Sequence, residues 1–138
     1  MTAPTVTHRV VMKISTVNAE SAPKAAGGYA QAVAISGATR FLFISGQIPE
    51  TPAGKVPSDF PAQARLVWHN LFAQLTAARM TVANLVKVTI FLSSRDFAIV
   101  NREIRREALG THSPALTVII TGIFDEHWLL EIEAIAAE

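Results

Sequence analysis

The chain has 138 residues, the length of one ordinary domain; half of them are apolar and 17% are charged, which excludes intrinsic disorder. Twelve Lys and Arg against eleven Asp and Glu leave a formal net charge of +1, too little to attract nucleic acid or an anionic membrane. The absence of cysteine excludes disulfides, thiolate nucleophiles and cysteine-based metal sites, and the four histidines lack the spacing of metal ligands.

The first half of the chain predicts three strands. Residues 1–8 are expected to form a flexible terminus, and residues 9–15 alternate apolar and polar side chains as a short strand does. Further strands are predicted over 29–35 and 40–45. The connection between them is four residues long and contains Gly37, so it predicts that these two strands pair as a hairpin.

The second half predicts two helices and three strands. Ser58 or Asp59 can cap a long helix, whose apolar positions recur at spacings of three and four: Ala64, Val67, Trp68, Leu71, Leu75 and Ala78. A strand over 85–92 follows. The second helix is expected to end at Gly110. Its buried stripe is expected to consist of Phe97, Val100, Ile104 and Ala108. Strands over 115–121 and 128–136 complete the chain.

No segment predicts membrane insertion or export. The most apolar stretch, residues 115–124, is shorter than the roughly 20 residues that a helix needs to cross a bilayer. The first residues carry no basic end followed by a continuous apolar region, as a secretory signal would. We therefore expect a cytoplasmic protein with no membrane partner.

This order of elements predicts one α+β domain over residues 1–138, with two helices packed on one face of a mixed sheet. The other face of the sheet is not fully polar, because Leu129 and Ile135 of the last strand share it with Glu131 and Glu133. Two helices can cover only one apolar face. We therefore infer a homo-oligomer in which sheets meet face to face.

The two glutamates are the most informative polar residues. Glu131 and Glu133 lie two apart on a strand, so their side chains point to the same face. A carboxylate in apolar surroundings needs hydrogen-bond donors or a polar cleft. One of the two glutamates can be a general acid, a general base or a water-positioning group between subunits, or both can be structural carboxylates at the rim of an interface.

Other candidate groups have two interpretations each. The mixed charges over residues 102–107 favour a solvated helix face over a phosphate or RNA site. His112 and His127 can shuttle protons or be ordinary surface residues. Tyr29, the one tyrosine, can contact a ligand or close the edge of the core.

Several segments, taken in order, resemble the RidA/YjgF family. These segments are residues 22–24, 27–33, 43–49, 86–92, 96–101 and 131–136. The resemblance runs from about residue 22 to the C-terminus, with the elements in the order given above. Each segment is a weak signal alone, but so many in sequence make a specific match.

The resemblance implies a chorismate-mutase-like fold assembled as a homotrimer, with the sheets forming a central barrel and a small-molecule cleft at each subunit interface. Active members of the family hydrolyse enamines and imines to a 2-oxo acid and ammonia, and they use no metal and no cofactor. Glu131 matches the family glutamate that handles the attacking water. The residues that match those lining or shaping the cleft are Tyr29, Ser45, Gly46 and Asn101.

One position departs from the family. Active members carry an arginine that binds the substrate carboxylate where this chain has Leu116, and Val118 stands where many members have cysteine. We therefore expect a RidA-like hydrolase with altered substrate specificity, in which Arg40 or Arg102 is a candidate to bind a carboxylate. The alternative is a trimeric small-molecule-binding protein without turnover. Endoribonuclease activity, a label that family members often carry, is disfavoured by the near-zero net charge.

Overall fold

The computed structural model describes residues 1–5 and 11–138. Six strands and two helices follow one another in the described part. In chain order they are β1 (Lys13–Val17), β2 (Ala32–Ser36), β3 (Phe41–Gln47), α1 (Phe60–Ala77), β4 (Leu85–Leu92), α2 (Ala98–Leu109), β5 (Ala115–Ile120) and β6 (Leu130–Ala137). Short 3₁₀ turns over Val82–Asn84 and Arg95–Phe97 precede β4 and α2.

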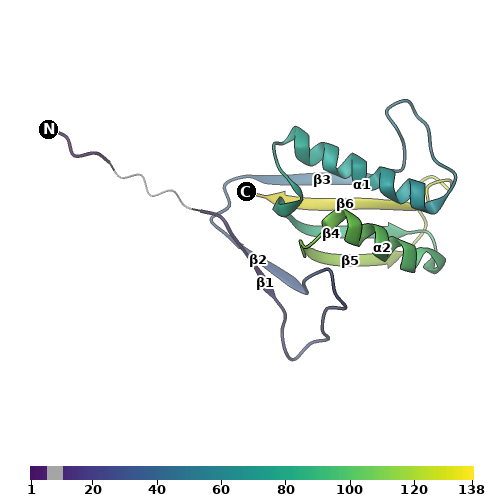
Figure 1. Cartoon of the computed structure of the whole chain (residues 1–138), viewed down its shortest axis with the longest axis horizontal. Helices are drawn as coiled ribbons and strands as arrows, with labels where there is room; N and C mark the ends of the chain where they lie inside the picture. Colours follow the sequence, from purple (N-terminus) through teal and green to yellow (C-terminus); the bar gives the residue numbers. More distant parts are fainter. Residues whose placement is uncertain (6–10) are drawn as a thin grey trace.

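Four of the strands form one mixed sheet in the order β3-β6-β4-β5. β6 is antiparallel to both of its neighbours, whereas β4 and β5 are parallel and are joined by a crossover through α2. Both helices lie on the same face of this sheet (Figure 1). The predicted α+β fold with two helices on one face is therefore confirmed.

The predicted hairpin between the second and third strands is wrong. β2 pairs with β1 in a separate two-stranded antiparallel sheet that lies beside the main sheet (Figure 1). β3 instead pairs with β6, and the pairing extends past the strand end, because Arg40 and Glu138 exchange backbone hydrogen bonds of 3.0 Å. A short connection favours pairing between strands that are neighbours in sequence. Here the backbone N–H and C=O groups of β3 instead form their hydrogen bonds with β6.

The start of the chain lies partly outside the described residues. The first strand was predicted over 9–15, whereas β1 begins at Lys13. Residues 9 and 10 of the predicted strand lie outside the described part. Residues 1–5 form no helix or strand. His8 and residues 6–7 of the expected flexible terminus also lie outside.

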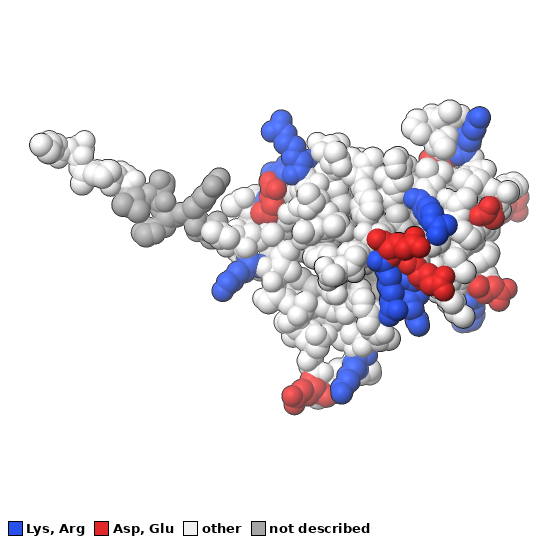
Figure 2. Space-filling model, in the orientation of Figure 1, with Lys and Arg blue, Asp and Glu red and all other residues white. Residues whose placement is uncertain are grey.

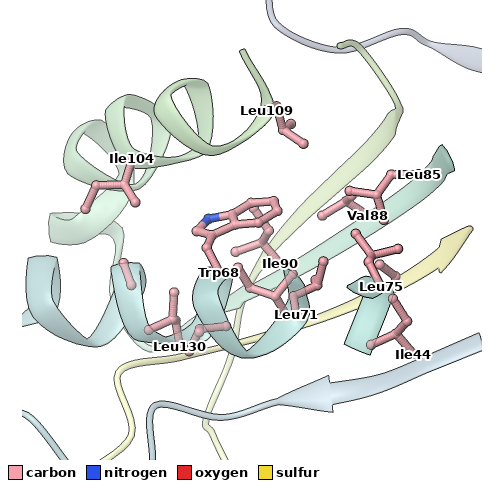
Figure 3. Close-up of a cluster of buried hydrophobic side chains, with 14 of the residues drawn as sticks. Ile44, Trp68, Leu71, Leu75, Leu85, Val88, Ile90, Ile104, Leu109 and Leu130 are labelled. Carbon is pink, nitrogen blue, oxygen red and sulfur yellow. The ribbon is translucent and has the colours of Figure 1, made fainter. Parts of the chain in front are cut away.

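Helix α1 forms as the sequence predicts and supplies six of the eighteen buried residues of the hydrophobic core in the described part. The Asp59 carboxylate caps the helix by accepting a 2.8 Å hydrogen bond from the backbone amide of Ala62. The buried face of α1 packs on the sheet (Figure 3). That face consists of Phe60, Ala64, Val67, Trp68, Leu71 and Leu75, together with the polar Gln63. Opposite it, Val88, Ile90 and Ile132 of the sheet are fully buried.

Helix α2 is rotated relative to the prediction. Ile104 is buried as expected, but Phe97, Val100 and Ala108 are only half-buried. The other buried residues of the helix are Asn101, Arg105 and Leu109. The helix ends as predicted at Gly110, whose φ of +59° favours glycine.

We call the sheet face that carries no helix the open face. Apolar side chains on it are strongly exposed: Phe43 is 74% exposed, Phe41 55% and Ile119 42%. The same face carries the half-buried Phe91 and Ile135. The predicted two-sided apolarity of the sheet is therefore present. The apolar side chains lie toward both ends of the open face, with the polar row Glu133, Thr89 and Thr117 between them.

No helix in residues 1–5 and 11–138 has both the length and the apolar character that crossing a bilayer would require.

We expect Gln63→Leu to destabilise the fold. The Gln63 side chain donates to the carbonyls of Pro57 and His127 at 2.8 and 2.9 Å and accepts from the amide of Leu129 at 2.8 Å. Losing three such bonds lowers the free energy of unfolding by about 2–3 kcal/mol, which urea unfolding at a fixed protein concentration measures.

The matched control is Gln74→Leu, because Gln74 is an exposed residue of the same helix. Its effect should stay within about 0.5 kcal/mol. Equal effects of the two substitutions would show that the Gln63 hydrogen bonds to Pro57, His127 and Leu129 do not stabilise the fold.

Candidate functional site

The irregularity between β3 and β6 brings Gly46 against Glu131. The register of the two strands shifts between Ile44 and Gln47, and Gly46 lies within this interval. A Cβ atom at Gly46 would lie 2.5 Å from Oε2 of Glu131 and 2.7 Å from its carboxyl carbon. Only glycine therefore allows the Glu131 carboxylate to rest against the backbone of β3.

The Glu131 carboxyl lies in surroundings that favour its protonated form. Partial burial raises the pKa of Glu131 above its ordinary value, and the neighbouring Glu133 raises it further. Glu131 takes part in none of the ion pairs or side-chain hydrogen bonds found in the described residues. A carboxyl with a raised pKa keeps its proton to a higher pH than an ordinary glutamate, which suits it to exchanging protons with a bound molecule.

Ser45 and Glu133 lie close to Glu131 on the open face. They line a cavity of about 270 Å³, together with Phe43, Lys87 and Thr89. Gly46 lies against Glu131, and Ser45 precedes Gly46 in β3 and lines this cavity. We call these three residues the glutamate group.

A second set of residues surrounds another cavity, which we call the arginine pocket. Its volume is about 230 Å³, and it is lined by Ala26, Gly27, Tyr29, Arg102, Arg105, Leu116 and Val118. The loop before β2 reaches β5 here, because the amide of Ala30 donates a 3.0 Å hydrogen bond to the carbonyl of Pro114. Tyr29 therefore lies in this loop and not in a strand, which corrects the predicted strand over 29–35.

The conformation of this loop requires glycine. Gly27 and Gly28 have φ angles of +101° and +75°, and the Tyr29 hydroxyl accepts a 3.1 Å hydrogen bond from the amide of Ala26. A Cβ atom at Gly27 would lie 3.1 Å from Nη2 of Arg106. The glycine pair thus lets the loop approach helix α2 closely enough to close the pocket.

The polar side chains beneath this loop are buried and incompletely paired. Asn101 and Arg105 lie one turn apart on α2 and are 3% and 4% exposed. Oδ1 of Asn101 and Nε of Arg105 have no hydrogen-bond partner among the described residues. Burial lowers the pKa of Arg105, and the nearby charges of Arg102 and Arg106 lower it further.

The arginine pocket and the glutamate group lie on opposite faces of the sheet. Leu116 pairs with Val88, whose side chain packs in the core beneath the helices, whereas Glu131 pairs with Phe91 on the open face. Because successive side chains of a strand alternate between faces, Leu116 and Glu131 of one chain point away from each other. One copy of the chain cannot bring both residues into a single cleft.

The remaining candidates have local partners. The guanidinium of Arg40 pairs with Glu138 at 2.6 Å and donates to the carbonyl of Ala78, so it is not available for a substrate. The His112 ring lies 2.7 Å from the carbonyl of Leu85, and the exposed His127 pairs with Asp125 at 3.3 Å. Within the described part of the chain, no three His, Asp or Glu side chains gather as a metal site would require.

Arg105 is the residue that sequence reasoning missed, because the interpretation of residues 102–107 as a solvated face placed it in water. The interpretation holds for Arg102, Glu103, Arg106 and Glu107, which are exposed, but not for Arg105. Acidic and basic side chains lie together over α2 in Figure 2, and Arg65 pairs with Glu107 at 3.5 Å. The position of Arg105 one turn after Asn101 was the available signal.

Comparison with known proteins identifies close relatives. A family model described as Endoribonuclease L-PSP matches residues 19–138. A RutC family protein of Haemophilus influenzae is 39% identical over 130 residues, which cover 91% of this chain and 98% of that protein. TdcF of Escherichia coli, named as a candidate reactive intermediate deaminase, is 34% identical over 125 residues, which cover 87% of this chain and 94% of that protein.

The similarity extends to the fold. The crystal structure of Escherichia coli TdcF with bound serine matches with a TM-score of 0.68 and 29% sequence identity. The match covers 90% of this chain and 98% of that one, so the similarity extends over most of the fold.

The raised pKa of Glu131 predicts a pH-dependent cost to folding. Between the unfolded and folded pKa values the folded chain holds more protons, so its stability falls as the pH rises through that range. A glutamine side chain at this position cannot titrate. The stability of Glu131→Gln relative to the wild type should therefore increase with pH and level off above the folded pKa, as urea unfolding at several pH values measures.

Glu103→Gln, a substitution of an exposed glutamate on α2, is the control and should track the wild type at every pH. Parallel curves for Glu131→Gln and the wild type would contradict the assignment of a raised pKa.

Proposed function

The chain belongs to the Endoribonuclease L-PSP family, also named RidA/YjgF, and from this premise we propose that it is a RidA-like deaminase that hydrolyses a small enamine or imine at a site shared between copies of the chain. The supporting observation is the placement of Gly46 and Glu131 on one face of the sheet and of Tyr29 and Leu116 on the other side. Each copy carries two half-sites.

Assembly completes the site in this proposal. The open face of one copy, with Phe41 and Phe43 exposed, packs against another copy, and a homotrimer is the assembly that the family resemblance implies. The glutamate group of one subunit then meets the arginine pocket of its neighbour. Burying the exposed aromatic side chains supplies the driving force, since apolar area contributes about 25 cal/mol per Å² removed from water.

The reaction adds water across a C=N bond. The carboxylate of Glu131 accepts a proton from the water while the water oxygen attacks the imine carbon. The imine nitrogen is protonated, which gives a carbinolamine. The carbinolamine then loses ammonia, and the carbonyl forms as its hydroxyl gives up a proton. One imine and one water yield one 2-oxo compound and one ammonia. Only proton transfers are needed, and a carboxyl with a raised pKa can make them in both directions.

Leu116 and Val118 shape the substrate specificity. Both line the arginine pocket, where the side chain of a substrate would lie. An apolar wall favours imines with an aliphatic side chain over the smallest ones, with each buried methylene contributing about 0.8 kcal/mol.

A binding protein without turnover is the second candidate, favoured by Leu116 at the position of the family arginine. Endoribonuclease activity is disfavoured, because the net charge is +1 and charges of both signs are interspersed over α2.

We expect Glu131→Gln to lower the rate of ammonia release by about 100- to 10,000-fold, the contribution of one general acid–base group. The assay generates the imine from an aliphatic amino acid with an oxidase and measures ammonia. Glu133→Gln is the matched control on the same strand and face. It should keep most of the activity and move the pH profile to lower pH, because Glu133 raises the pKa of Glu131. Turnover by Glu131→Gln at the wild-type rate would exclude catalysis by this carboxyl and favour the binding protein.

We expect Phe43→Asp to dissociate the assembly and to abolish activity together with it, because a charge replaces an apolar contact and the half-sites separate. Sedimentation equilibrium measures the mass. Ile99→Asp is the control, since Ile99 is equally exposed, at 74%, but lies on α2. Activity in a monomeric Phe43→Asp variant would contradict a shared site.

A further inference from the structure

Arg105 is a buried cation without a counter-charge in the described part of the chain. Its residue surface is 4% exposed, and its Nε atom finds no hydrogen-bond partner there. The protein oxygen that its Nη2 atom approaches, the carbonyl of Gly27, lies 3.5 Å away, at the outer limit for a hydrogen bond. The guanidinium also lies 5.7 Å from the centre of the Tyr29 ring. Among the described residues, the guanidinium therefore has one marginal hydrogen bond, and its Nε donor is buried without a partner.

The acidic residues do not compensate this charge. The ion pairs in residues 1–5 and 11–138 join Arg40 to Glu138, Arg65 to Glu107 and His127 to Asp125. None of them includes Arg105 or its neighbours Arg102 and Arg106. Burial and these two neighbours lower the pKa of Arg105, which means that its charged form is disfavoured by its surroundings. Arginine nevertheless keeps its proton in proteins, so the charge stays in place and can pair with an anion from outside the chain.

The space beside Arg105 fits a small molecule with one anionic end. The arginine pocket has a volume of about 230 Å³, somewhat below the roughly 300–1,000 Å³ of drug-sized sites. Arg105 lies on one side of the pocket, and Leu116 and Val118 form an apolar wall. The pocket thus combines a planar donor that suits a carboxylate with a surface that suits an aliphatic chain.

We propose that Arg105 binds the carboxylate of a small 2-oxo or 2-imino acid, with the aliphatic side chain of that acid against Leu116 and Val118. Turnover of such an acid rests on the function proposed above, but its binding does not. The cation comes from α2 and lines the same pocket as Leu116. The pocket therefore keeps a partner for a carboxylate although β5 supplies an apolar residue.

Pyruvate is the probe for binding, and methyl pyruvate, which lacks the charge, is its neutral counterpart. We expect backbone amide NMR signals of residues 26–30 and 102–105 to shift and saturate with pyruvate. Arg105→Gln should weaken pyruvate binding tenfold or more, the fold-change that about 1.4 kcal/mol represents, and leave methyl pyruvate unaffected. Arg106→Gln removes the same charge from an exposed neighbour and should change the affinity less than threefold.

Three results would overturn the inference: no pyruvate binding by the wild type, equal losses for Arg105→Gln and Arg106→Gln, or equal weakening of methyl pyruvate.

Thermal stability separates binding from a structural role. An uncompensated buried charge opposes folding, so Arg105→Met should melt at the same temperature as the wild type or higher when no anion is present. Pyruvate should raise the melting temperature of the wild type but not that of the variant. A melting temperature several degrees lower for Arg105→Met would mean that the guanidinium holds the loop in place, and it would overturn the inference.

Activity distinguishes this inference from the proposed function. Pyruvate binding that depends on Arg105 without ammonia release would refute the deaminase and leave the inference standing. Leu116→Arg adds a second guanidinium to the same pocket, so we expect no gain in activity or a loss, because like charges repel in a partly dry site. A tenfold gain on carboxylate-bearing imines would show that the pocket lacked an effective cation.

Discussion

The alternation of side chains across the four-stranded sheet is the constraint on which the rest of the structure depends. The two helices cover one face of the sheet, where Val88, Ile90 and Ile132 are fully buried. The other face must therefore present both Phe43 and Glu131, an exposed apolar ring and a carboxyl on the same surface. This combination is unfavourable in an isolated chain, because the ring is left in water, and it becomes useful when a second surface covers it.

The same alternation separates the residues that the family resemblance groups in one cleft. Leu116 lies in the row of Val88, and Glu131 lies in the row of Phe91. Neither a change of rotamer nor a loop movement can transfer a strand side chain to the other face, because that requires a shift of register by one residue. In the proposed function, a single sheet therefore carries two incomplete sites, and assembly and chemistry are coupled by geometry.

The sequence predicted the parts of the fold that depend on strong periodicity. The stripe of α1, the Asp59 cap, and the strands β4 to β6 lie close to the predicted positions. Strand pairing was predicted less well, because the partner of β3 is β6, about 90 residues away, and a short loop signals only local pairing. Of the candidate site, the sequence singled out Glu131 and Gly46, which lie against each other in the structure. Arg105 was missed because a charged residue in a charged segment gives no sign of burial until the rotation of α2 is known.

The single tyrosine of the chain lies at the mouth of a cavity, with its hydroxyl on the amide of Ala26 and its ring near a guanidinium. Its ultraviolet absorption responds to the charge and polarity around the phenol ring, and no other residue contributes a phenol signal. If a ligand enters that cavity as we propose, the phenol reports its occupancy in a difference spectrum, in which the overlapping absorption of the two tryptophans cancels where it is unchanged. A difference spectrum at the phenol band follows ligand entry in real time, without a label and without altering any residue.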